Sequence, residues 1–134
     1  MANILYIIRG LPGSGKSTLG ETLCPGRCFS ADQFFETDGV YKFVGAKIPQ
    51  AHAFCRENVR SAMSDGSNQD VAVANTFTRE SEMSEYPEMA ARAGYSHFVL
   101  SCENNFGNIH GVPLEAVARM SARWQNYYGD HGGK

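Results

Sequence analysis

A glycine-rich run near the N-terminus, followed by a lysine and two hydroxyl residues, has the composition and spacing of a phosphate-binding loop. Residues 10–18 have the sequence Gly-Leu-Pro-Gly-Ser-Gly-Lys-Ser-Thr and match the pattern G-x-x-x-x-G-K-[ST] at every fixed position. Glycines permit backbone angles that let successive N–H groups point at one anion. We therefore predict that a nucleoside triphosphate is held by this loop, through Gly10, Leu11, Pro12, Gly13, Ser14, Gly15, Lys16, Ser17 and Thr18.

Two side chains of this loop have the chemistry that phosphoryl transfer needs. Lys16 would reach the β- and γ-phosphates, and the Ser17 hydroxyl would hold Mg²⁺. The flanking residues supply the required context. An apolar run at 4–8 predicts a buried parallel strand, and residues 16–23, which lack helix breakers, predict a helix whose N-terminus faces the anion.

Polar residues also follow two other predicted strands, at residues 27–30 and 71–74. Asp32 comes just after the first, and Asn75 and Thr76 come directly after the second. The carboxyl ends of parallel strands are where open α/β sheets present functional groups. Asp32 has two interpretations, a catalytic or metal-binding carboxylate and a helix N-cap. P-loop proteins often carry a magnesium-directing Asp at the end of a strand like 71–74, but this position is Ala74, so the metal would depend on Ser17 and Asp32.

Four aromatic residues cluster within ten positions after Asp32: Phe34, Phe35, Tyr41 and Phe43. They could pack a small satellite core or form a wall on which a planar acceptor stacks. The Asp38-Gly39 pair between them is a turn signal, so this stretch is predicted to be a small hairpin or a loop. On the next predicted helix, residues 51–63, His52 is a candidate for contact with a substrate, with a solvated surface residue as its alternative.

The remaining pattern predicts an α/β fold. A helix ending at Gly94, a fourth strand at 95–100 and a last helix from Pro113 give a three-layer, Rossmann-like P-loop NTPase with a short parallel sheet flanked by helices. With 134 residues, 43% hydrophobic content and a net charge of −2, we expect one domain over 1–134 in the cytoplasm, without membrane association. The cysteines Cys24, Cys28, Cys55 and Cys102 are expected to be reduced and mostly buried rather than zinc ligands.

Beyond the loop itself, the sequence resembles the small P-loop kinases of the polynucleotide-kinase type. The likeness includes phage kinases of 5-hydroxymethyluracil in DNA and the ATP-binding domain of an animal ubiquitin-ligase-binding protein. It rests on residues 9–19, 30–35 and 39–43, on Asn75-Thr76, and on His110-Gly111-Val112-Pro113 and Arg123-Trp124. It thus extends over almost the whole chain.

The resemblance implies ATP- and Mg²⁺-dependent transfer of a phosphoryl group to a hydroxyl, with Asp32 as general base and Lys16 as a catalytic cation. Two positions depart from the family: Ala74 replaces an Asp, and Gly107 stands where relatives carry a lid arginine. Candidates to supply that positive charge are Arg79, Arg119 and Arg123. Phe34, Phe35, Tyr41, Phe43, His52, Asn75 and Thr76 are the predicted contacts of the acceptor.

Several acceptors fit this picture. The favoured one is a hydroxymethylated pyrimidine in phage DNA, which would place the protein in the host cytoplasm, and a 5′-hydroxyl end of a polynucleotide is the second. A small metabolite is a third possibility, which the slightly negative net charge suits. A nucleotide-binding protein that has lost catalysis is the fourth, because of Ala74 and Gly107.

Overall fold

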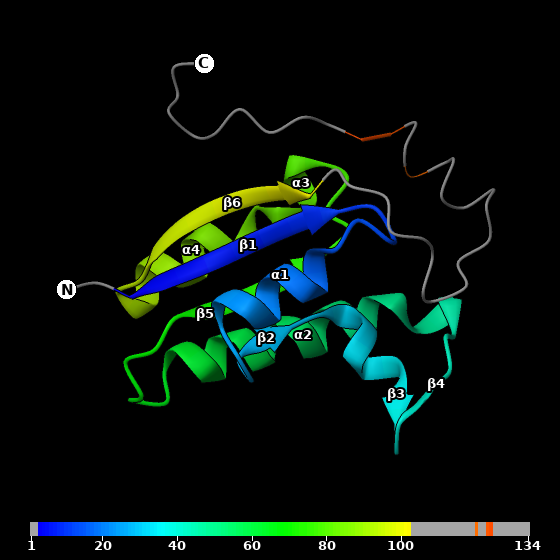
Figure 1. The fold of residues 1–134 in the computed structure, drawn as a ribbon, viewed down its shortest axis with the longest axis horizontal. Coiled ribbons are helices and arrows are strands. Elements are labelled where there is room, and N and C mark those ends of the chain that lie inside the picture. The colour runs from blue at the N-terminus through cyan, green and yellow to red at the C-terminus, as the bar shows by residue number, and fades with distance from the viewer. Residues whose placement is uncertain (1–2, 103–119, 121–122, 125–134) are drawn as a thin grey trace.

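A four-stranded parallel sheet organises the protein. The computed structural model describes residues 3–102, 120, 123 and 124, and most of the predicted helix from Pro113 lies outside them. Figure 1 looks onto the sheet, with helices in front of it and behind it. The strands of the sheet are β1 (Ile4–Gly10), β2 (Cys28–Phe29), β5 (Val71–Asn75) and β6 (Ser96–Cys102); the α-helices are α1 (Lys16–Leu23), α2 (Ile48–Met63), α3 (Glu80–Met83) and α4 (Glu85–Ala93).

The order of the strands is β2-β5-β1-β6, and all pairings are parallel. β5 has no exposed residue, as its continuous apolar sequence predicts for a strand covered on both faces. In this register Arg9 of β1 lies opposite Asn75 of β5 and Ser101 of β6. The carboxyl ends of three strands therefore meet at one edge of the sheet, which is where the phosphate-binding loop leaves β1.

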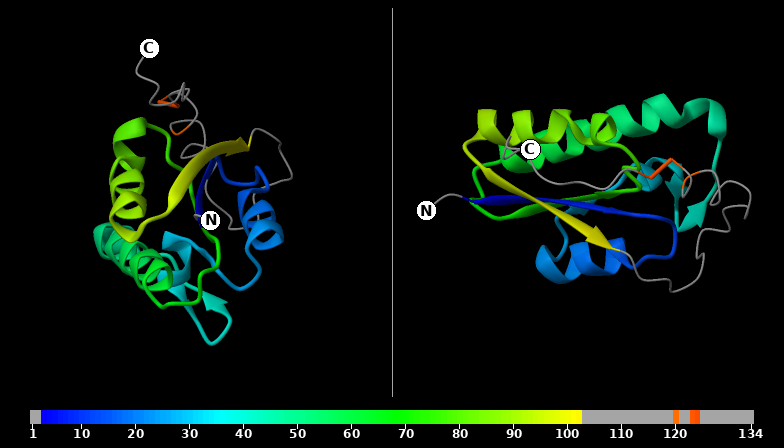
Figure 2. Two further views of the ribbon diagram at one scale, coloured as in Figure 1. Left: turned by 90° about the vertical axis from the view of Figure 1, so that its left-hand side faces the viewer. Right: turned by 90° about the horizontal axis from the view of Figure 1, so that it is seen from above.

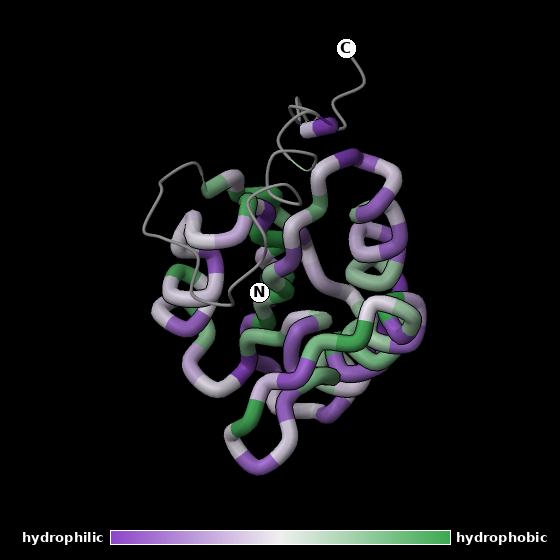
Figure 3. Tube along the Cα trace, turned by 90° about the vertical axis from the view of Figure 1, so that its right-hand side faces the viewer, coloured by the Kyte–Doolittle hydropathy of each residue, from purple (hydrophilic) through white to green (hydrophobic). Residues whose placement is uncertain are grey.

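The two faces of the sheet carry separate apolar layers. Leu5, Ile7, Val71 and Val73 face α2 and α4, whereas Ile8, Ala72 and Ala74 face Cys24 and Cys28 on the side of α1. The two views of Figure 2 show α2 and α4 on one side of the sheet and α1 on the other. Viewed from the end of the molecule, the hydrophobic stretches lie mostly inside and the hydrophilic ones on the outer helices (Figure 3). The predicted three-layer P-loop NTPase fold is confirmed.

Local structure follows the predicted signals with small shifts. A hairpin of β3 (Glu36–Thr37) and β4 (Val40–Tyr41) turns at Asp38-Gly39, where both residues have positive φ. The second helix begins at Ile48 rather than at residue 51, with Pro49 in its first turn. The segment before Gly94 divides at Ser84 into α3 and α4, whose N-caps are Arg79 and Ser84.

The four thiols are unpaired, and Cys24, Cys28 and Cys55 are buried, as the sequence predicts for reduced cysteines. Burial is the main reason why the pKa of the Cys28 thiol rises to about 12. None of the helices within residues 3–102 is long and apolar enough to cross a membrane.

The contact between α1 and β2 makes one stability prediction. A Cβ on Gly20 would lie 2.3 Å from Sγ of Cys28. Overpacking costs about 1–3 kcal/mol, and the better helix propensity of alanine recovers about 1 kcal/mol. We expect Gly20→Ala to lower the free energy of unfolding in urea by about 1 kcal/mol. Gly45→Ala is the control, since its Cβ would lie 3.7 Å from the Phe43 ring; equal stability of both variants would contradict the packing described.

Candidate active site

The phosphate-binding loop closes tightly between β1 and α1. Gly13 and Gly15 have φ of 84° and 89°, a region that side chains disfavour. A Cβ on Gly10 would lie 2.1 Å from the Ser14 hydroxyl and 3.0 Å from the backbone oxygen of Cys102. Gly15 is the N-cap of α1 and supplies no side-chain cap, so the first N–H groups of the helix are left for another acceptor.

The polar groups of the loop are arranged for an anion. The Ser14 hydroxyl is buried without a hydrogen-bond partner among the described residues. Lys16 Nζ donates a long hydrogen bond of 3.5 Å to the Leu11 carbonyl, and burial lowers the pKa of the lysine. The side chains of Ser17 and Thr18 are exposed. A buried unpaired donor and a desolvated ammonium group both gain from a phosphate, so these residues fit the predicted triphosphate.

Asp32 lies on a 3₁₀ turn, η1 (Ala31–Phe35), directly after β2. Its negative charge acts on Lys16, where it raises the pKa of the ammonium against the larger effect of burial. Asp32 follows the carboxyl end of β2, at the same edge of the parallel sheet where the phosphate-binding loop leaves β1. The N-cap of η1 is Ser30, whose N–H donates to the Gln33 side chain at 3.3 Å. The alternative that Asp32 itself caps a helix is wrong.

Asn75 holds that turn against the sheet. Its Oδ1 accepts a hydrogen bond of 2.8 Å from the N–H of Ala31, and its Nδ2 donates to Sγ of Cys55 at 3.6 Å. The residue is 6% exposed, so both ends of its amide are used inside the protein. The structure gives Asn75 a role in fixing the backbone next to Asp32, while its predicted contact with an acceptor stays a prediction.

The neighbours of Asn75 connect the strand end to the loop. The carbonyl of Thr76, which is half-buried, accepts a hydrogen bond of 3.3 Å from the N–H of Gly10. Ala74 is buried in the layer that faces α1. A magnesium-directing carboxylate is thus missing at this position, and Ser17 and Asp32 remain the predicted metal ligands.

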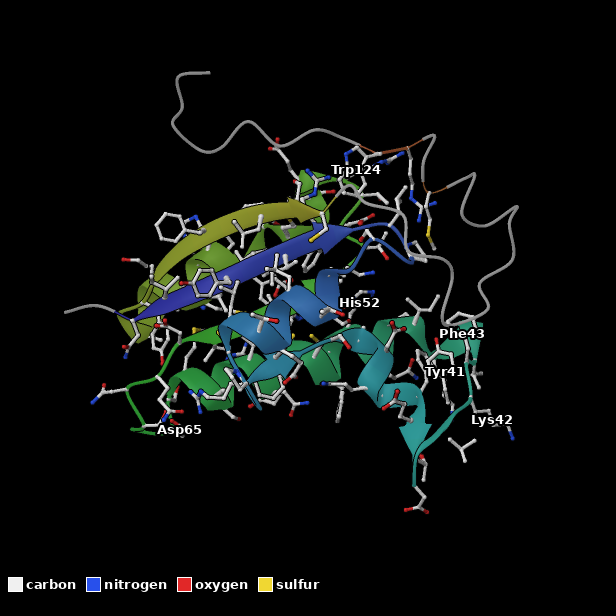
Figure 4. All side chains as sticks on the ribbon, in the orientation of Figure 1. Tyr41, Lys42, Phe43, His52, Asp65 and Trp124 are labelled. Carbon is white, nitrogen blue, oxygen red and sulfur yellow. The ribbon has the colours of Figure 1, made fainter. Side chains whose placement is uncertain are left out.

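The aromatic segment packs against the main core and leaves one ring exposed. Phe35 is buried in the main core and contacts Phe34, Tyr41 and Phe43, with ring centroids 5.1–6.3 Å apart. Phe43, however, is 54% exposed at the end of this cluster. Figure 4 shows Tyr41, Lys42 and Phe43 together at the hairpin end of the molecule. Phe34 and Tyr41 therefore pack with Phe35 on the main core rather than in a separate satellite core, and stacking of an acceptor on the exposed Phe43 ring stays a prediction.

Two further groups lie near Asp32. The hydroxyl of Tyr41 donates to Asp32 Oδ1 at 3.2 Å, and burial together with that carboxylate raises the pKa of Tyr41 to about 12. His52, on α2, is drawn between α1 and the hairpin in Figure 4. Burial and then the charge of Arg56 lower the pKa of His52, while Glu82 and Asp32 oppose that shift. At neutral pH the phenol is therefore a hydrogen-bond donor and the imidazole is mostly neutral.

The three arginine candidates differ in position. Arg79 is exposed at the start of α3, and Arg119 lies outside the described residues. Nε of Arg123 donates to the Thr78 hydroxyl at 3.1 Å, beyond the end of β5. That hydroxyl also contacts the Glu82 carboxylate at 3.1 Å. Of the two described candidates, Arg123 is the one that the structure joins to the sheet edge.

Arg9 has a role that sequence reasoning missed. The side chain is fully buried at the end of β1, where Nε donates to the Phe77 carbonyl at 3.0 Å and one terminal nitrogen to the Thr78 carbonyl at 3.2 Å. The Trp124 ring covers its guanidinium at 3.9 Å. The signal was present in the sequence, because an arginine that continues an apolar strand must find partners inside the protein. Arg9 links the phosphate-binding loop, the end of β5 and the C-terminal Trp124.

This anchor makes a second stability prediction. Hydrogen bonds to charged groups contribute about 1.5–3 kcal/mol each, so Arg9→Met should lower the free energy of unfolding by about 3 kcal/mol or more. Arg92→Met is the control, because Arg92 pairs with Glu88 on an exposed helix face at 3.4 Å, where such pairs are worth about 0.3–0.5 kcal/mol. Urea titrations that give both variants the same loss would refute the role of Arg9.

Comparisons with known proteins agree with this geometry. A family model described as "AAA domain" matches residues 5–105. Human NEDD4-binding protein 2 is 28% identical over 137 residues, which covers 92% of this chain and 8% of that protein. The chain therefore spans only a small part of the length of that curated relative.

Solved structures of kinases resemble the fold. A gluconokinase from Sinorhizobium meliloti matches with a TM-score of 0.59 and 16% identity over 97% of this chain and 78% of its own. The APS kinase CysC of Mycobacterium tuberculosis matches with a TM-score of 0.56 and 14% identity over 91% of this chain and 96% of its own. At these identities the likeness shows the fold, a P-loop kinase-like one, and the match over residues 5–105 shows that the chain belongs to the AAA domain family.

Proposed function

We propose that the protein is an ATP- and Mg²⁺-dependent kinase that phosphorylates a hydroxyl group of a nucleic acid. The observation that supports this proposal is that Asp32 follows β2 at the same edge of the parallel sheet where the loop that carries Lys16 leaves β1. A lysine for the phosphates and a carboxylate for the acceptor are the two side chains that this reaction needs most.

Each residue of the site has a separate role in the proposed phosphoryl transfer. The loop amides, the Ser14 hydroxyl and Lys16 hold the β- and γ-phosphates and stabilise the charge on their oxygens. Asp32 accepts the proton of the acceptor hydroxyl while the oxygen of that hydroxyl bonds to the γ-phosphorus. The bond from that phosphorus to the β–γ bridging oxygen breaks, and ADP leaves. Mg²⁺, held by Ser17 and Asp32, would supply further charge stabilisation.

The segment that follows the hairpin turn favours a nucleic acid as acceptor. Residues 39–54 include Lys42 and Lys47 and no acidic residue, although the whole chain has a net charge of −2. The exposed ring of Phe43 lies between these lysines in the sequence, and Phe54 is 39% exposed nearby. Exposed aromatic rings next to lysines are typical of surfaces that stack bases and contact phosphates. A base that carries a hydroxymethyl group, turned out of a duplex, would reach Asp32 from this side.

The test compares acceptors directly. Protein, Mg²⁺ and γ-labelled ATP are incubated with hydroxymethyluracil DNA, with 5′-hydroxyl oligonucleotides, and with free nucleosides and sugar acids. We expect label on hydroxymethyluracil DNA, with a KM that rises with salt because phosphate contacts are screened. Label on 5′ ends alone would show that the acceptor is the 5′-hydroxyl end of a polynucleotide rather than a modified base. Label only on small molecules, or ATP binding without transfer to any acceptor, would overturn it.

A further inference from the structure

The hydroxyl of Tyr41 has a position that its predicted contact with the acceptor does not explain. It points back at Asp32 and donates to Oδ1 at 3.2 Å, across the chain from β4 to η1. Tyr41 is half-buried, and its ring meets the buried Phe35 edge-on, with centroids 6.3 Å apart at 74°. Because Phe35 fixes the ring, the place of the hydroxyl is fixed as well.

Two hydrogen bonds therefore restrict the position of Asp32, one through its backbone turn and one through its side chain. Its turn is held by the hydrogen bond from Ala31 N–H to Asn75 Oδ1, 2.8 Å long, and its carboxylate by Tyr41. A donor on one carboxylate oxygen restricts the plane of the carboxylate group. A general base must lie within hydrogen-bond reach of the proton that it removes, so this plane matters for the reaction.

We propose that Tyr41 is a positioning residue, whose hydroxyl orients the Asp32 carboxylate toward the acceptor hydroxyl. This inference rests on the proposed function, in which Asp32 is the base. It makes the β3–β4 hairpin part of the catalytic apparatus, since the last residue of β4, two positions before the exposed Phe43, carries the hydroxyl that orients the base.

Tyr41→Phe tests this, because it keeps the ring against Phe35 and removes the hydroxyl alone. We expect kcat to fall about tenfold, while KM for ATP and KM for the acceptor stay within about twofold. Tyr95→Phe is the matched control, since Tyr95 donates to the Gln69 carbonyl at 2.7 Å, away from the phosphate-binding loop. Thermal unfolding of both variants checks that each is folded, and a crystal structure of Tyr41→Phe should show the Asp32 carboxylate rotated.

The outcomes separate the two proposals. An active wild type whose kcat is unchanged in Tyr41→Phe overturns the positioning role and leaves the proposed kinase intact. A rise in acceptor KM with an unchanged kcat also overturns it, because Tyr41 would then contact the substrate. A wild type that transfers no phosphate to any hydroxyl overturns both.

Discussion

Asp32→Asn should reduce phosphotransfer by a factor of about 10²–10⁴, the usual contribution of a general base, while ATP still binds. Asparagine has nearly the shape of aspartate but cannot take up the proton of the acceptor. The hydrogen bond from Ala31 to Asn75 does not involve the Asp32 side chain, so the turn should keep its place. Single-turnover kinetics with labelled ATP, together with calorimetric titration of ATP, measures the two effects separately.

Asp38→Asn is the matched control for that variant. It makes the same chemical change six positions away, in the hairpin turn, where φ of 52° suits asparagine as well as aspartate. We expect its turnover to equal that of the wild type. If Asp32→Asn turns over at the same measurable rate as the wild type, Asp32 is not the base. If both proteins bind ATP and neither transfers phosphate, the protein is a nucleotide-binding module.

Lys16→Met should have the second large effect. Removing one charge that stabilises the transferring phosphoryl group costs about 10²–10³ in kcat, and the affinity for ATP should fall too. The nucleotide-free protein should remain as stable as the wild type. The reason is that burial lowers the pKa of Lys16, so the folded state already disfavours the ammonium form. Steady-state kinetics, ATP titration and thermal unfolding measure these three quantities.

Lys47→Met serves as the control for Lys16, since it removes an exposed cation outside the phosphate-binding loop. It should leave ATP affinity unchanged and weaken only the binding of a nucleic acid strand. A Lys16→Met protein that binds ATP and turns over like the wild type would show that the loop does not hold the triphosphate.

Much of the fold could be predicted from local patterns. The apolar strands at the centre, the glycine loop and the helix after it are each specified by short stretches, and the structure reproduces the helix Lys16–Leu23 at both ends. Boundaries were less predictable where tertiary contacts extend an element. β1 continues to Gly10 because Arg9 and Gly10 pair with Ser101 and Cys102 of β6.

The sequence indicates candidate site residues but not the contacts between them. The sequence places Lys16 and Asp32 after strands of one sheet, and the structure brings their charges within reach of each other. The sequence could not indicate that the Tyr41 hydroxyl donates a hydrogen bond to Asp32, or that the Asn75 side chain forms hydrogen bonds with both Ala31 and Cys55. These contacts depend on how the hairpin and α2 pack on the end of the sheet, and no sequence period encodes that packing.

The most direct test of the central claim is a structure of the protein with Mg²⁺ and a non-hydrolysable ATP analogue. We predict that the β- and γ-phosphates lie in the loop of residues 10–18 against Lys16, with the Asp32 carboxylate facing the outer side of the γ-phosphate, where an acceptor hydroxyl would enter. A γ-phosphate directed away from Asp32, or an analogue bound elsewhere on the molecule, would contradict the account.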